Sequence, residues 1–255
     1  PLSTSVFSCV VKRVPFISNW LENDDVNADP PTVAVAVPSC GMSKYISYKV
    51  QKKPNGLPEA FIIGEDFINK DNVALILGDN FFYAQNLSSL LLEATKLKKG
   101  SQVILHKVNN PELYGVACVK KKKISSIIEK PKKFISDKAI TGHYFIDNNV
   151  VNFSKKLQKS KRNELEITDL LKIYNKQNKL KYKELGRGAV WLDTGSIDDF
   201  YNASLFVSTI ENRQGIKIAW LEEIALNNKW ISKKEIKNSI KFYGKCKYSN
   251  YLKSF

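Results

Sequence analysis

Two aspartates placed at the ends of apolar runs are the residues best suited to chemistry. Asp79 follows the run 73–77, and Asp193 follows the run 190–192. Short apolar runs of this kind predict buried strands, and ligands of α/β sheets bind beyond the carboxyl ends of such strands. Two carboxylates meeting there could hold one Mg²⁺, which takes few protein ligands and adds phosphate oxygens. The alternative interpretation is that both are turn residues, a common role for Asp.

The elements that must position these aspartates alternate between strands and helices from about residue 46 onward. Strands are expected at 73–77, 140–146 and 180–185, and helices near 148–158 and 166–177. Such alternation predicts an α/β fold with a Rossmann-like, mostly parallel mixed sheet flanked by helices, followed by C-terminal helices.

Capping residues predict where several helices begin and end. Ser196 with Asp199, and Ser232 with Glu235, have the spacing of a capping box. Ser88 is expected to cap the helix that follows the 73–77 strand, and Gly215 is expected to end the helix that begins after Ser196.

The charge balance is strongly basic, with 40 Lys and Arg against 25 Asp and Glu in 255 residues, a net charge of +15. The lysines are spread along the chain, and the block 120–123 reads as the tip of a hairpin between strands at 114–119 and 124–128. Without an RNA- or DNA-binding pattern beside them, we expect no nucleic-acid partner. A positive surface also suits small anionic substrates such as sugar phosphates and nucleotides.

Other classes of protein are disfavoured by the sequence. No apolar run approaches the ~18 residues of a membrane span, and the first residues lack a secretory signal. The four cysteines show no CxxC pair, so we expect free thiols and a cytoplasmic location without membrane contact. His106 and His143 have no nucleophile at suggestive spacing and are expected to be ordinary core or surface histidines.

Ordered motifs give the chain a family resemblance. The segments LGDNFFY, EKP, ELEITD and GRGAVWLDTG occur at 77–83, 129–131, 164–169 and 186–195. Each motif is weak alone, but in this order, from about Lys44 to Leu252, the chain closely resembles the bacterial glucose-1-phosphate thymidylyltransferases.

The resemblance implies a reaction and its catalytic residues. Glucose 1-phosphate and dTTP would give dTDP-glucose and pyrophosphate, a step that depends on positioning and charge neutralisation. Asp79 and Asp193 would hold the Mg²⁺ that bridges the phosphates, and Lys130 and Arg162 would bind the sugar's phosphate. Taken alone, Lys130 and Arg162 are most simply surface charges among other lysines.

The resemblance also implies a substrate pocket. Asn80, Gly115, Glu129 and the backbone near Ile140 would line the glucose site, and a second group would read the thymine base, namely Gln51, Gly56 and Leu57. The alternatives are that Glu129 pairs with a surface lysine, that Gln51 is an ordinary polar residue and that Gly56 serves a turn.

The resemblance stops short of the N-terminus. In the family, a Gly-Gly-x-Gly-Thr-Arg-Leu loop whose N–H groups cradle the triphosphate precedes the tetrapeptide that matches residues 1–4. That loop does not occur in this sequence, and residues 5–41 do not match, although 33–37 reads as a strand.

Three regions are therefore predicted: 1–43 as a divergent remnant of the nucleotide-binding part, 44–215 as the α/β nucleotidyltransferase domain and 216–255 as a helical segment. The family implies a homo-oligomer, commonly a tetramer, that supplies dTDP-rhamnose and surface polysaccharide synthesis. Two alternatives stay open: an inactive homologue that retains sugar-phosphate binding, and a relative that uses another nucleotide.

Overall fold

A computed structural model describes residues 8–12, 32–36 and 46–255 of the chain. The chain forms two compact units, one that includes residues 47–200 and one that includes residues 201–255. Their division falls inside helix α6 (Ile197–Gln214). The predicted N-terminal region 1–43 lies largely outside the described residues; its described parts are strands β1 (Ser8–Lys12) and β2 (Thr32–Ala36), the latter confirming most of the strand predicted at 33–37.

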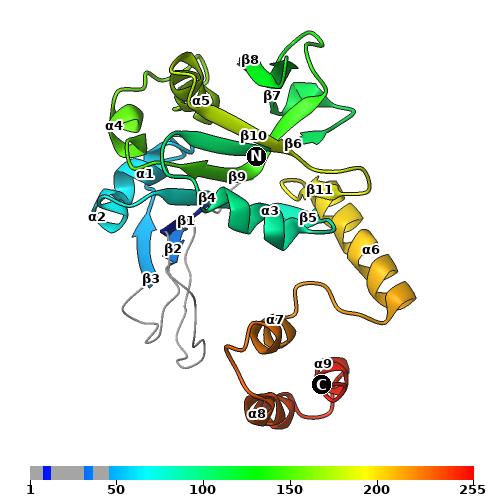
Figure 1. The fold of residues 1–255 in the computed structure, drawn as a ribbon. Helices are drawn as coiled ribbons and strands as arrows, with labels where there is room; N and C mark the ends of the chain where they lie inside the picture. The colour runs from blue at the N-terminus through cyan, green and yellow to red at the C-terminus, as the bar shows by residue number, and fades with distance from the viewer. Residues whose placement is uncertain (1–7, 13–31, 37–45) are drawn as a thin grey trace. The chain divides into compact units, whose positions relative to one another are not determined.

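The first unit is built on a mixed sheet whose described strands run in the order β10-β6-β9-β4-β1-β2-β3 (Figure 1). Their bounds are β3 (Ile46–Val50), β4 (Val73–Leu77), β6 (Ser101–Lys107), β9 (Lys138–Ile146) and β10 (Leu180–Glu184). The hairpin of β7 (Gly115–Lys120) and β8 (Lys123–Glu129) joins this sheet through β9. A separate antiparallel pair consists of β5 (Asn80–Tyr83) and β11 (Val190–Asp193).

The α/β class and the mixed sheet are confirmed, but the predominance of parallel strands is not found among the described pairings. β1–β2 and β10–β6 are parallel. By contrast, β9 lies antiparallel between β4 and β6, and β1 is antiparallel to β4. The reason is connectivity: β6, β7, β8 and β9 follow one another without an intervening α-helix, so the chain reverses direction instead of crossing over.

Helices cover both faces of the sheet. Val103 and Leu105 face the larger core, which includes residues of α1 (Glu59–Ile63), α4 (Val150–Lys155) and α5 (Ile167–Lys176). Ile104, between them in the strand, faces the opposite side and packs with Ala94 of α3 (Leu87–Ala94). Side chains alternate along a strand, so burial on both faces explains the continuous apolar runs in the sequence. α1 and α4 lie side by side (Figure 1).

Local sequence rules account for most element ends. The tip of the β7–β8 hairpin is confirmed, with Lys121 and Lys122 at φ 48° and 59°, the left-handed conformation of a tight hairpin turn. The backbone N–H of Asp199 donates to Ser196 Oγ at 3.1 Å, as predicted for the start of α6. The cap at Ser88 is wrong: α3 begins at Leu87, after Asn86, and Ser88 lies inside the helix.

The remaining short helices of the first unit are α2 (Glu65–Ile68) and a 3-10 turn at Pro111–Leu113. The second unit contains α7 (Leu221–Asn227), α8 (Lys233–Tyr243) and α9 (Lys247–Leu252), packed around a small apolar core. The predicted capping box of Ser232 and Glu235 opens α8. In the described part of the chain, no helix combines the length and apolarity needed to cross a membrane.

Candidate functional site

The two predicted metal-binding aspartates are brought together by the β5–β11 pair. Asp79 directly precedes β5, and Asp193, the last residue of β11, pairs with Asn80. Thr194 ties the two strand ends together, because its backbone N–H and its Oγ1 both donate to the carbonyl oxygen of Asp79, at 2.7 and 2.8 Å. Asp193 is therefore positioned by this small sheet rather than by the main one.

The electrostatics of this aspartate pair favour a cation. Burial and then the charge of Asp79 raise the pKa of Asp193, while the backbone N–H of Gly195, 3.1 Å from Asp193 Oδ1, lowers it. In the described residues no group of three acidic, His or Cys side chains could hold a metal. Two close carboxylates nevertheless fit Mg²⁺, which needs few protein ligands when phosphate oxygens complete its shell.

Asn80 connects this aspartate pair to the main sheet. Its Oδ1 accepts from the backbone N–H of Gly142 at 3.0 Å and from Trp191 Nε1 at 2.7 Å, and its Nδ2 donates to Asp79 Oδ1 at 2.8 Å. A Cβ on Gly142 would lie 2.4 Å from Asn80 Oδ1, so only glycine allows this approach. The amide of Asn80 thus keeps one N–H for a ligand.

The predicted sugar residues Gly115 and Glu129 face each other across the β7–β8 hairpin. A Cβ on Gly115 would lie 3.0 Å from Glu129 Oε2 and 2.7 Å from a methyl carbon of Thr168. Burial and then the charge of Glu166 raise the pKa of Glu129. Glu129 is therefore a half-buried acceptor held beside a glycine, and within residues 46–255 it forms no ion pair with a lysine.

Lys130 directly follows Glu129 at the end of β8. Its side chain is exposed, and its backbone, at φ 41°, donates to the carbonyl of Tyr114 at 3.0 Å. Burial is the main cause that raises the pKa of Glu129 and of Asp193, and the positive charge of Lys130 lowers both pKa values in part.

Arg162 is fixed by two carboxylates of the loop before α5. Its Nε and Nη2 donate to the two oxygens of Glu166, each at 3.1 Å, and its Nη2 also donates to Glu164 Oε2 at 3.0 Å. Ser160 Oγ adds a hydrogen bond to Glu166 at 2.6 Å. Arg162 is connected to the sugar residues through Glu166, whose charge acts on Glu129.

The predicted base-reading residues form a loop that packs on the Arg162 loop. Gly56 has φ +101°, and an added Cβ would lie 2.1 Å from the carbonyl oxygen of Leu165. Gln51 Nε2 donates to the carbonyl oxygen of Gly56 at 3.2 Å and to Glu59 Oε2 at 2.6 Å. Gln51 and Gly56 therefore maintain the loop, and Leu57 packs against the main core.

The side chain of Ile140 lies in the hydrophobic core and not among these polar residues. It is 6% exposed, pairs with Leu105 and belongs to the main core. That the backbone near Ile140 lines the glucose site stays a prediction.

Sequence reasoning missed Glu166 and Trp191. Glu166 lies in the ELEITD motif, and its spacing of four positions from Arg162 was a sign of an ion pair, whereas its burial has no signal in the sequence. The hydrogen bond of Trp191 to Asn80 joins residues 111 positions apart, and no local pattern indicates it.

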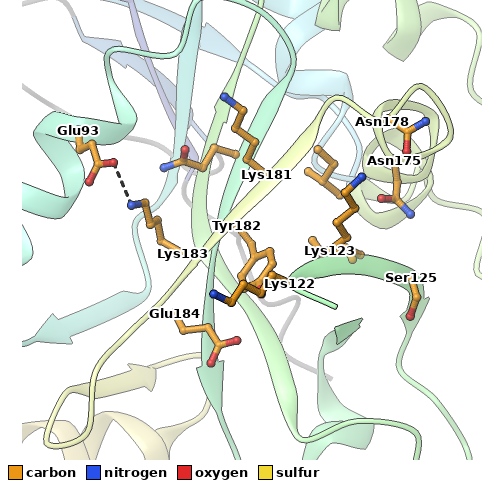
Figure 2. A pocket seen from close by; sticks show the side chains of 13 residues that line it. Glu93, Lys122, Lys123, Ser125, Asn175, Asn178, Lys181, Tyr182, Lys183 and Glu184 are labelled. Carbon is orange, nitrogen blue, oxygen red and sulfur yellow. Dashed lines mark ion pairs between the residues drawn. The ribbon is translucent and has the colours of Figure 1, made fainter. Parts of the chain in front are cut away.

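A cavity of about 1010 Å³ shares no residue with this site and is lined in part by the residues of strand β10 (Figure 2). It is rich in lysine, but Lys183 is paired with Glu93 at 2.9 Å (Figure 2). Among the described strands β10 pairs only with β6, and lysines on such an edge strand prevent pairing with other chains. These lysines therefore have a structural explanation.

Comparison with known proteins shows the family to which the chain belongs. Residues 39–210 match the Nucleotidyl transferase family. A glucose-1-phosphate thymidylyltransferase of Neisseria meningitidis serogroup A is 45% identical over 208 residues, covering 81% of this chain and 72% of the relative. A glucose-1-phosphate thymidylyltransferase of Mycobacterium tuberculosis is 39% identical over the same shares of both chains.

Solved structures show the same fold. A protein of Bacillus anthracis, described as a glucose-1-phosphate thymidylyltransferase and solved with sucrose, has a TM-score of 0.57 at 35% identity over 68% of this chain and 65% of that one. A UDP-glucose pyrophosphorylase bound to UDP-glucose also has a TM-score of 0.57, at 26% identity over 64% of this chain and 66% of that one. This chain thus spans about two thirds of the length of both. The chain belongs to the nucleotidyl transferase family and, within it, to the glucose-1-phosphate thymidylyltransferases.

Proposed function

We propose that this protein joins glucose 1-phosphate to dTTP, giving dTDP-glucose and pyrophosphate. The observation that carries the proposal is that the β5–β11 pair brings Asp79 and Asp193 together at one end, within a chain whose relatives are named for this reaction. We further propose Mg²⁺ as the cofactor, a cytoplasmic location and a role in supplying dTDP-rhamnose and surface polysaccharide synthesis in a homo-oligomer.

The proposed chemistry is an in-line displacement. A phosphate oxygen of glucose 1-phosphate forms a bond to the α-phosphorus of dTTP, and the bond between the α-phosphorus and its bridging oxygen breaks, so that pyrophosphate leaves with the electron pair. Mg²⁺, when bound, neutralises phosphate charge and aligns the two reactants. The protein's task is to orient groups that carry strong negative charge.

Each residue has a role in that task. Asp79 and Asp193 hold the cation, while Lys130 and Arg162 bind the phosphate of the sugar, Lys130 as a point charge and Arg162 through its planar guanidinium. Glu129 accepts hydrogen bonds from sugar hydroxyls.

The remaining substrate contacts are less direct. Asn80 offers its remaining N–H to the sugar, next to Gly115 and the backbone of Ile140. The loop of Gln51, Gly56 and Leu57 forms the side where the base binds.

The test is pyrophosphate release from glucose 1-phosphate and a nucleoside triphosphate in the presence of Mg²⁺. We expect dTTP to give a higher kcat/KM than UTP or CTP, and Lys130→Ala to raise KM for glucose 1-phosphate. An equal kcat/KM with UTP would mean that the enzyme accepts a broader class of nucleotides than dTTP. Calorimetric binding of glucose 1-phosphate, without release of pyrophosphate from any triphosphate, would contradict the proposed activity.

A further inference from the structure

The guanidinium of Arg162 is held by two carboxylates that differ in their surroundings. Glu166 binds it through both of its oxygens and has a side chain that is only 8% exposed. Glu164 binds it through a single oxygen at 3.0 Å, and its side chain is 37% exposed. The contact with Glu166 is therefore buried and bidentate, whereas the contact with Glu164 is solvent-exposed and monodentate.

The geometry leaves part of Arg162 available. Glu166 uses Nε and one hydrogen of Nη2, and Glu164 meets the same Nη2. Arginine carries five N–H donors in one plane, two of them on Nη1. The contacts with Glu164 and Glu166 use only Nε and Nη2, so Nη1 takes no part in them. The side chain of Arg162 is 42% exposed, which lets an anion approach the guanidinium from solvent.

Glu166 has further reasons to stay in place. Ser160 Oγ donates to its Oε1 at 2.6 Å, and Glu166 lies at the N-terminal end of α5, where a negative charge is favoured. Moving Glu166 would break three hydrogen bonds of a buried carboxylate, whereas moving Glu164 would break one contact of a solvated carboxylate. Only Glu164 can be exchanged for another anion at small cost.

We infer that Glu166 is the positioning residue of Arg162 and that Glu164 occupies the place of the substrate's phosphate until glucose 1-phosphate displaces it. The inference rests on the proposed function for the identity of that phosphate. A carboxylate that must leave lowers the apparent affinity, and it keeps the guanidinium neutralised while the site is empty. Glu164 and Glu166 therefore act in opposite directions on phosphate binding.

The test is calorimetric titration of the folded chain with glucose 1-phosphate, without metal, in single variants. Glu166→Gln removes the negative charge and replaces one of the two oxygens that bind Arg162 by an NH₂ donor. The Kd for glucose 1-phosphate should therefore rise about tenfold, which corresponds to the loss of one charge-assisted hydrogen bond. Glu164→Gln should lower Kd by about two- to threefold, because a neutral side chain competes less well for Arg162. Glu166→Asp keeps the charge and should regain part of the loss.

Controls separate positioning from simple folding effects. Methyl α-glucoside, which has no phosphate, should bind the wild-type chain and the Glu166→Gln variant equally well. Glu65→Gln removes the carboxylate of the exposed pair with Lys155 and should change neither Kd nor the melting temperature. If Glu166→Gln does not fold, the comparison is made with Glu166→Asp, which should still bind the phosphate more weakly than wild type.

The inference is overturned if Glu166→Gln and Glu166→Asp leave Kd unchanged, or if Glu164→Gln weakens binding as much as Glu166→Gln. Failure of the proposed function gives a different result, namely a wild-type chain that does not bind glucose 1-phosphate. Inorganic phosphate is then the probe: weaker phosphate binding in Glu166→Gln supports the positioning of Arg162 by Glu166, and equal binding contradicts it.

Discussion

Replacing Asn80 by alanine should destabilise the protein and separate the aspartate pair from the sheet. The substitution removes the acceptor of the Gly142 N–H and of Trp191 Nε1, together with the donor to Asp79. Gly142 lies in the buried part of β9, and Trp191 is 8% exposed. Two buried donors are therefore left without their partner.

The magnitude follows from what those donors lose. A buried donor without a partner costs ~1–3 kcal/mol. Water can hydrate one of the two donors in the variant and reduce its cost. We therefore expect the free energy of unfolding to fall by about 2–4 kcal/mol in total. Asp79 is half-buried and can be hydrated, so its lost donor adds little. This loss is a large share of a typical domain stability of ~5–15 kcal/mol.

The assay is urea unfolding of the wild-type chain, Asn80→Ala, Trp191→Phe and the double variant. Because Trp191→Phe removes one of the two donors, Asn80→Ala should cost about 1 kcal/mol less in that background than in the wild type. A cost below about 0.5 kcal/mol for Asn80→Ala, or full additivity in the double variant, would refute the idea that Asn80 holds the strands together.

Three further predictions concern other parts of the first unit. Gly56→Ala should lower the free energy of unfolding by at least about 2 kcal/mol, because the new Cβ clashes with the backbone of Leu165 and the residue has a left-handed φ. Gly188→Ala is the control: its φ is +88° but nothing lies within 4 Å of the new Cβ, so it should cost only about 1 kcal/mol. Equal losses in the two variants would contradict the clash at Gly56. Burial lowers the pKa of His143 to about 4, so the stability that depends on neutral His143 is complete above pH ~6.5 and is lost as pH falls toward 4, by about 3 kcal/mol. The pH dependence of urea unfolding should flatten in His143→Leu, and an unchanged slope would be evidence against this cause. Because the pKa of Glu129 is raised, binding of methyl α-glucoside, which carries no titrating phosphate, should weaken on acidification at a higher pH than an ordinary glutamate would give, and binding that is independent of pH down to about 4.5 would argue against Glu129 as an acceptor.

The sequence predicted those parts of the fold that depend on local rules. Apolar runs identified β4 and β9, and the spacing of Ser232 and Glu235 identified the start of α8. Direction of pairing is not a local property, and the alternation rule therefore failed where four strands follow one another without an α-helix between them.

The candidate site was predictable only in part. Asp79 and Asp193 were identified from their positions at strand ends, and the structure joins them through β5 and β11. The contacts that fix the site depend on long-range pairing, as between Asn80 and Trp191, or on burial, as for Glu166. Neither can be derived from residue type and spacing alone.

Phosphorus NMR of glucose 1-phosphate, dTTP and Mg²⁺ with the folded chain tests the central claim most directly. We predict the diphosphate resonances of dTDP-glucose together with pyrophosphate for the wild-type chain, and a loss of at least about 100-fold in rate for Asp193→Asn, which keeps the shape of the side chain but removes the charge that binds the cation. Undiminished conversion by Asp193→Asn, or no conversion by a folded wild-type chain, would contradict the account.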